Sequence, residues 1–218
     1  MKSDFSFAGK KGLDNRGFTL IEMAIVLIII GIIIGAVVKG KDIIKSGEQK
    51  KLYTKFLNAW QQTYNNYYDR TGMVLGDVDD MDNGVTAGSG RDGFCDRASA
   101  DNLDAQLKAV GLEVLPKGVT GKSTQVTYVD STGRNNVIEI VFDSKKSPSR
   151  LGNFMRITGI PGDLAIAWDK VIDGVMNGKE GDFIYTADYT SADPTPDNFP
   201  SPETDPSGNA AAILKLSF

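Results

Sequence analysis

The longest apolar run of the chain lies near its N-terminus and contains a single charged residue. Residues 18–38 carry only one ionisable side chain, that of Glu22. As a helix, about 20 residues at about 1.5 Å each span about 30 Å, which is the thickness of a bilayer's hydrocarbon core. Because apolar residues occupy every side of such a helix, the run predicts a membrane span instead of an amphipathic core helix. A carboxylate at this depth is costly, so Glu22 is a candidate functional residue that needs a partner.

After the apolar run, the pattern becomes that of an amphipathic helix. Aromatic and apolar residues recur at spacings of three and four, while lysines and amides fill the other sides. The residues of this stripe are Tyr53, Phe56, Leu57, Trp60, Tyr64, Tyr67 and Tyr68. The stripe predicts a stem helix over residues 39–70 whose aromatic side packs against a head domain.

The remaining residues, 71–218, predict a mixed head with loops, short helices and strands. A helix is expected over 99–110, with Ser99 as its cap and Gly111 at its end. A second helix is expected after Pro161, and its apolar face is expected to hold Leu164, Trp168, Val171, Ile172 and Val175. Alternating residues predict strands around 126–128, 137–142, 154–160, 182–186 and 212–218. Taken together, the pattern predicts an α+β fold, a long N-terminal helix packed on an antiparallel sheet.

Two segments of the head are acidic and rich in turn-forming residues. Residues 187–209 contain five prolines and predict an irregular loop. In the other segment, the carboxylates Asp77, Asp79, Asp80 and Asp82 raise the alternative of an irregular calcium site. The EF-hand register that begins at Asp79 places unsuitable residues at its third and twelfth positions. A solvated acidic loop is therefore the favoured interpretation.

Composition argues against enzyme chemistry and predicts no cofactor. The chain has no histidine, which removes histidine-based triads, general bases and zinc sites. Its one cysteine, Cys95, cannot form a disulfide within the chain. The net charge is −4, which argues against direct nucleic-acid binding. A structural subunit is favoured over a hydrolase.

A secretory signal peptide is the main rival interpretation of the N-terminus. Four basic and two acidic residues precede the apolar run, as in such peptides. The apolar core of a signal peptide, however, has about 7–15 residues, and this run is longer. In addition, no Ala-x-Ala cleavage pattern follows the run. The small residue, Gly17, lies before the run instead.

The residues around Gly17 resemble a known signature. Lys10, Lys11 and Arg16 precede Gly17, and the sequence Phe-Thr-Leu-Ile-Glu follows at 18–22. This order is similar to the prepilin signature of type IV pilins and type II secretion pseudopilins. The resemblance implies that a membrane peptidase cuts after Gly17 and methylates the new amino terminus at Phe18. It also implies that Glu22 compensates the Phe18 amino group of a neighbouring subunit during assembly.

The resemblance further implies a set of partners and a location. The partners are the prepilin peptidase and methyltransferase, other copies of the chain and minor pilins in a helical filament, an inner-membrane assembly platform and membrane lipid. Before assembly the chain is expected in the inner membrane with its head outside the cytoplasm, and afterwards in an extracellular or periplasmic filament. Gly31 and Gly35 form a Gly-x-x-x-Gly face that allows close helix packing or local loosening of the helix, although glycine is also simply frequent in membrane helices.

The predicted organisation is a leader (1–17), a transmembrane and assembly helix (18–38), a stem helix (39–70) and a head (71–218). A type IV pilus subunit is the leading hypothesis. Many pilus subunits carry a proline shortly after the second glycine of the helix, which is Gly35 here, and this chain has none there. A secretion pseudopilin therefore remains an alternative. A single-pass anchored enzyme or binding module is the second alternative.

Overall fold

The computed structural model describes residues 18–77, 91, 93–96, 98–118, 120–147, 150–186, 199 and 211–217. The predicted leader and the carboxylates Asp79, Asp80 and Asp82 lie outside these residues, as does most of 187–209. The chain divides into two compact units, Met1–Lys45 and Ser46–Phe218, which we call the N-terminal unit and the head unit.

The first third of the described chain is helical. Helix α1 covers Leu20–Leu52, a π-helical turn η1 covers Tyr53–Leu57, and α2 covers Asn58–Thr71. In the π-helical turn the backbone N–H of Asn58 donates to the carbonyl of Tyr53, five residues earlier. Gly72 ends α2 with φ 67°, a left-handed conformation that glycine adopts without a steric penalty. We call residues 46–71, which belong to the head unit, the head helix.

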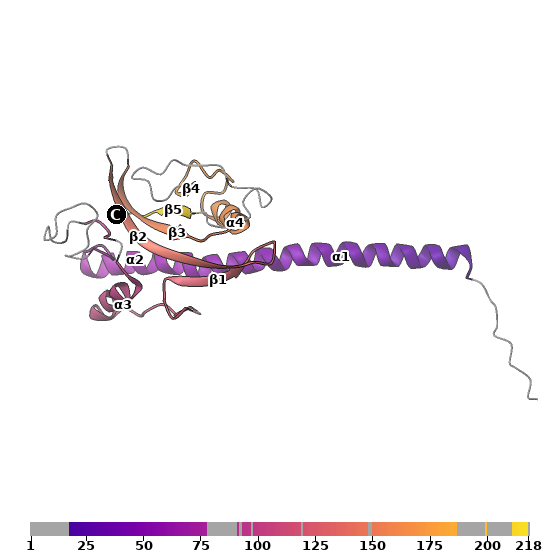
Figure 1. Ribbon diagram of the computed structural model, residues 1–218, viewed down its shortest axis with the longest axis horizontal. Coiled ribbons are helices and arrows are strands. Elements are labelled where there is room, and N and C mark those ends of the chain that lie inside the picture. The colour runs from indigo at the N-terminus through magenta and orange to yellow at the C-terminus, as the bar shows by residue number, and fades with distance from the viewer. Residues whose placement is uncertain are drawn as a thin grey trace, which may run out of the picture. The chain divides into compact units, whose positions relative to one another are not determined.

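The head unit contains one antiparallel sheet of five strands in the order β1-β2-β3-β5-β4 (Figure 1). The strands are β1 (Gln125–Val129), β2 (Asn135–Ser147), β3 (Arg150–Thr158), β4 (Phe183–Thr186) and β5 (Ala211–Lys215). Strand β5 lies between β3 and β4, so β1 and β4 form the two edges. The predicted α+β class and the five predicted strands are confirmed.

The core lies where the head helix meets the sheet. Trp60 meets Phe142 of β2 edge to face, and Tyr64 stacks on the same ring, each with 5.6 Å between ring centroids. Ile138 and Ile140 alternate with more exposed residues along β2 and point to the same side as Phe142. The indole Nε1 of Trp60 donates to the carbonyl of Ser123 at 3.1 Å, so its polar atom is satisfied. The aromatic stripe is thus the packing face that the sequence predicted.

Two further helices complete the head unit. Helix α3 covers Ala100–Ala109, and the hydroxyl of Ser99 caps it by accepting from the N–H of Asn102, as predicted. Helix α4 covers Gly162–Ile172 and contacts β4. The predicted apolar face of this helix is only partly right, because Val171 and Val175 are 42% and 67% exposed. The helix ends at Ile172, so Val175 belongs to the following turn, and the buried side is formed by Leu164, Ala165, Trp168 and Asp169.

The turn between β1 and β2 is organised by one buried carboxylate. Oδ1 of Asp130 accepts hydrogen bonds from the backbone N–H groups of Thr132 and Arg134 and from the Thr132 hydroxyl. Its Oδ2 accepts from Arg134 Nε at 3.0 Å and from Asn136 Nδ2 at 3.1 Å. Burial raises the pKa of Asp130, but these hydrogen bonds outweigh burial and hold the pKa well below its ordinary value.

Candidate functional site

The first turn of α1 is closed by a reciprocal pair of residues. The backbone N–H and the hydroxyl of Thr19 both donate to Glu22 Oε2 at 2.7 Å. In return, the backbone N–H of Glu22 lies 3.3 Å from the Thr19 hydroxyl oxygen and donates to it. This arrangement is a capping box, in which two N–H groups that a helix start leaves unpaired are satisfied by side chains. It was not predicted, although the Thr-x-x-Glu pattern signals it.

The capping box gives Glu22 a role within its own chain and leaves part of the carboxylate free. Only Oε2 accepts from Thr19, and in the described part of the chain no donor is assigned to Oε1. The residue is exposed at the helix N-terminus, where the helix dipole favours a negative charge. Phe18, also exposed, directly precedes Thr19. An amino group formed at Phe18 would therefore belong to the same helix end as this carboxylate.

The apolar side chains of the N-terminal unit have no core of their own. Of its described residues, none is buried, and Leu20 and Ile28 are 93% and 62% exposed. The described residues contain one helix long and apolar enough to cross a membrane, and it begins at Leu20. Such an exposed surface needs lipid or other helices to cover it.

The two candidate packing glycines lie on open surface. A methyl group built on Gly31 or Gly35 meets no atom within 4 Å in the described chain. Contacts within that part of the chain therefore do not require glycine at either position. Their roles in assembly, like those of Gly17, Phe18 and Glu22, stay predictions.

A hydrogen-bonded cluster fixes the head helix to the rest of the head unit. Gln49 Nε2 donates to the Tyr128 hydroxyl at 3.0 Å, and this hydroxyl donates to Asp163 Oδ2 at 3.1 Å. Trp168 Nε1 donates to the carbonyl of Gln49 at 3.3 Å. Burial and the nearby carboxylate of Asp163 raise the pKa of Tyr128, so the hydroxyl stays protonated and can donate. The cluster joins residues 79 positions apart, and no local sequence signal reveals it.

Of the four carboxylates of the alternative calcium site, the structure describes only Asp77. Asp77 is buried, and its Oδ2 accepts from the N–H of Gly93 at 2.9 Å. Among the described residues no group of three or more acidic, histidine or cysteine side chains could hold a metal ion. Asp79, Asp80 and Asp82 fall outside this part of the chain.

The only cysteine is placed for packing. Cys95 is fully buried, and its thiol donates to the carbonyl of Leu75 at 3.4 Å. Burial, and then the charges of neighbouring carboxylates, raise the pKa of the thiol well above its ordinary value. A thiol in this state is a poor nucleophile.

The N-terminal segment of the chain is similar to a known protein family. Residues 13–38 match the family described as the prokaryotic N-terminal methylation motif, the prepilin-type cleavage and methylation signature. No curated protein and no solved structure shows a significant match to the chain. The matched segment contains Gly17, the Thr19–Glu22 capping box and both candidate packing glycines.

Proposed function

We propose that this chain, which carries the prepilin-type signature, is a structural subunit of a type IV pilus-like filament. The signature itself supports a type IV pilin or pseudopilin-like precursor, and the exposed N-terminal helix fits a membrane-anchored one. In the proposal the chain is cut after Gly17, methylated at Phe18 and polymerised through residues 18–38. The observation that carries the proposal is a carboxylate with an open oxygen at the start of an exposed apolar helix.

The charge pair explains why processing and assembly are coupled. Opposite charges attract strongly in a medium of low dielectric constant, whereas either charge alone is costly there. The Phe18 amino group is created by cleavage, so the uncut precursor lacks the partner of Glu22. Because Thr19 occupies only Oε2, the carboxylate can keep its capping box and still accept the amino group of a neighbouring subunit at Oε1.

In the proposal, the N-terminal helices of neighbouring subunits pack together and form the fibre. Each subunit would cover the apolar surface of its neighbours in a bundle, which replaces lipid as the environment of these side chains. A repeated head-to-tail interface generates a filament when the rotation between neighbours does not close a ring, and the proposal takes this open form.

Two substitutions at Glu22 separate its capping role from its charge. Glu22→Gln keeps an amide that can close a capping box but loses the charge, whereas Glu22→Ala loses both. We expect both variants to insert into the membrane and both to form few or no fibres. Membrane fractionation and negative-stain microscopy of sheared surface fractions measure the two properties. Normal fibres from Glu22→Gln would refute charge pairing and leave only the capping box.

Processing has an independent test. Intact-mass analysis of purified fibres should show a chain that begins at Phe18 and carries one added methyl group. A fibre subunit that retains Met1–Gly17 would overturn the processing proposal.

The second candidate is a secretion pseudopilin, which the absence of a proline after Gly35 favours. Deletion of the chain distinguishes the two functions. Loss of surface fibres with normal protein secretion supports the pilus, and loss of secretion alone supports the pseudopilin.

A further inference from the structure

Two exposed lysines follow the apolar run of the N-terminal unit without a break in the helix. Helix α1 continues to Leu52, so Lys39 and Lys41 stand on the same helix directly after residues 18–38. We call these two residues the span-end lysines. Among the described residues no carboxylate forms an ion pair with either one. Residues 39–45 contain three lysines and one aspartate, so this end of the run carries a net positive charge.

The span-end lysines lie on opposite sides of the helix. An α-helix turns by about 100° per residue, so positions two apart differ by about 200° in direction. Along the axis the same two positions are only about 3 Å apart, which is less than the thickness of one headgroup layer, about 5–7 Å. A folded partner that covers one side of a helix meets one of these charges. Lipid headgroups surround a helix and meet both.

The residues that follow the span-end lysines are apolar and exposed. Ile43 and Ile44 are 73% and 65% exposed. Basic and apolar side chains side by side are typical of the boundary of a membrane, where apolar groups reach the acyl chains and lysine side chains extend to the headgroups. The helix that carries them is the one that is long and apolar enough to cross a membrane. Charge and continuity with the span therefore favour the same partner, a lipid surface.

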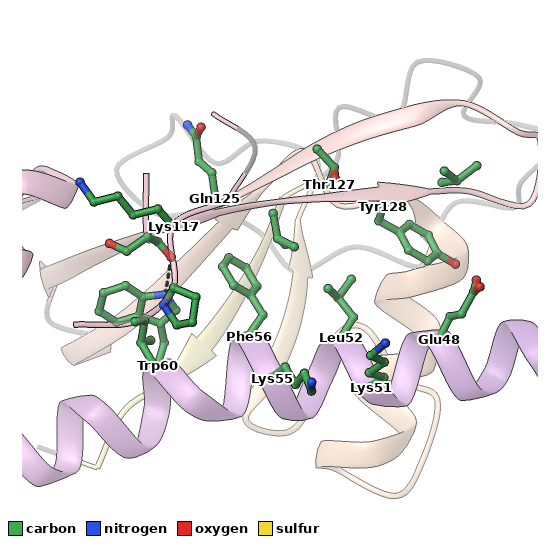
Figure 2. A pocket seen from close by; sticks show the side chains of 16 residues that line it. Glu48, Lys51, Leu52, Lys55, Phe56, Trp60, Lys117, Gln125, Thr127 and Tyr128 are labelled. Atoms are coloured by element: carbon green, nitrogen blue, oxygen red, sulfur yellow. Dashed lines mark hydrogen bonds between the residues drawn. The ribbon is translucent and has the colours of Figure 1, made fainter. Parts of the chain in front are cut away.

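A groove between the head helix and β1 is a weaker candidate for a binding surface. This groove, of about 580 Å³, is also lined by lysines, Lys51 and Lys55 (Figure 2). Its aromatic rings are however buried, since Phe56 and Trp60 are only 7% and 0% exposed. The groove thus presents little ring surface to a ligand, and it does not border the apolar run as the span-end lysines do.

We propose that Lys39 and Lys41 bind the headgroups of anionic phospholipids at the end of the span that continues into the head unit. Each ammonium group can donate hydrogen bonds to phosphate oxygens. An anionic headgroup also carries a net negative charge that a zwitterionic headgroup lacks, so the lysines should select between the two classes of lipid. The inference rests on the membrane-anchored precursor of the proposed function and not on the filament, and it adds a class of lipid to that precursor.

The test compares the two classes of lipid at the protein surface. The full-length chain is reconstituted in phosphatidylcholine vesicles with a trace of spin-labelled phosphatidylglycerol or spin-labelled phosphatidylcholine. Electron paramagnetic resonance measures the fraction of each label that the protein immobilises, and the two fractions give the preference for the anionic lipid. In Lys39→Gln/Lys41→Gln we expect this preference to fall about fivefold, the factor that one basic residue contributes at an anionic surface. About 1 M salt should abolish the difference from wild type, because charges are then screened within about 3 Å.

Two variants control for charge and position. Lys39→Arg/Lys41→Arg keeps both positive charges and should keep the preference of the wild type. Lys108→Gln/Lys179→Gln removes the same charge from exposed positions of the head unit and should also leave the preference unchanged. The basic residues of the leader add a background that is the same in every chain compared.

Equal lipid preferences in wild type and Lys39→Gln/Lys41→Gln would overturn the inference. If that variant also formed fewer fibres, the two lysines would instead contact a neighbouring subunit. Flotation of the vesicles after alkaline carbonate treatment tests the proposed function separately. A wild-type chain that carbonate extracts is not anchored in the membrane, and both the precursor and the inference are then wrong. A chain that floats with the vesicles but binds both lipids equally overturns the inference alone.

Discussion

In the N-terminal unit, large apolar side chains such as Ile28 are more than half exposed, whereas in the head unit Leu57, Trp60 and Phe142 are fully buried. Both units carry large apolar side chains. They differ in where the covering surface comes from, since the head unit supplies its own sheet and the N-terminal unit supplies nothing comparable in its described residues. Changes in the head unit should therefore alter folding, and changes in the N-terminal unit should alter assembly.

The largest effect on folding is expected from Trp60→Ala. The substitution leaves a cavity beside Phe142 and removes the donor to Ser123, so the free energy of unfolding of the head should fall by about 3–5 kcal/mol. Ile29→Ala, at a half-exposed position of the N-terminal unit, is the control and should change it by less than about 0.5 kcal/mol. Urea unfolding in detergent micelles, followed by near-ultraviolet circular dichroism, measures both. Equal losses would remove the distinction between the two units.

The same distinction determines how much the sequence could predict. The head's elements follow from local patterns, namely the cap at Ser99, the glycine after α3 and the alternation along β2. The insertion of β5 between β3 and β4 does not, because strand order depends on contacts between distant residues. The π-helical turn at Tyr53–Leu57 was also missed, because one π-helical turn inside a longer helix shifts the spacing of the stripe too little to be seen in the sequence.

At the candidate site the sequence identified the charged residue, Glu22, but not the hydrogen bonds that it forms. The lone charge at Glu22 was evident because it interrupts an apolar run. The Thr-x-x-Glu spacing also signals the capping box with Thr19, so Glu22 has a partner three residues away within its own chain. The cluster of Gln49, Tyr128 and Asp163 could not be predicted, since the fold alone brings these residues together.

A smaller, pH-dependent effect is expected at Asp130 in the head unit. Asp130→Ala removes the acceptor of five hydrogen bonds in the β1–β2 turn and should cost about 2 kcal/mol at pH 7. Because the pKa of Asp130 is lower in the folded state than in the unfolded state, its contribution is present above about pH 4 and is lost as the pH falls further. Urea unfolding of wild type and variant at pH 7 and pH 3 measures the difference. A gap between the two proteins that does not narrow at pH 3 would contradict the ionised role of Asp130.

The smallest effect on folding, and the finest test of the comparison, is Gly35→Ala. The added methyl group meets no atom within 4 Å in the described chain, so unfolding of the head should be unchanged. In an isolated helix alanine is favoured over glycine by about 1 kcal/mol, so the N-terminal helix itself should not suffer. If the Gly31 and Gly35 face packs closely against a neighbouring subunit, the methyl group separates the two backbones, and fibres should dissociate at a lower detergent concentration than wild type. Leu27→Ala, which removes atoms from an exposed side chain about two turns earlier, serves as a control for general loss of apolar contact. Fibres of Gly35→Ala that resist detergent as well as wild type would reduce these glycines to the ordinary composition of a membrane helix.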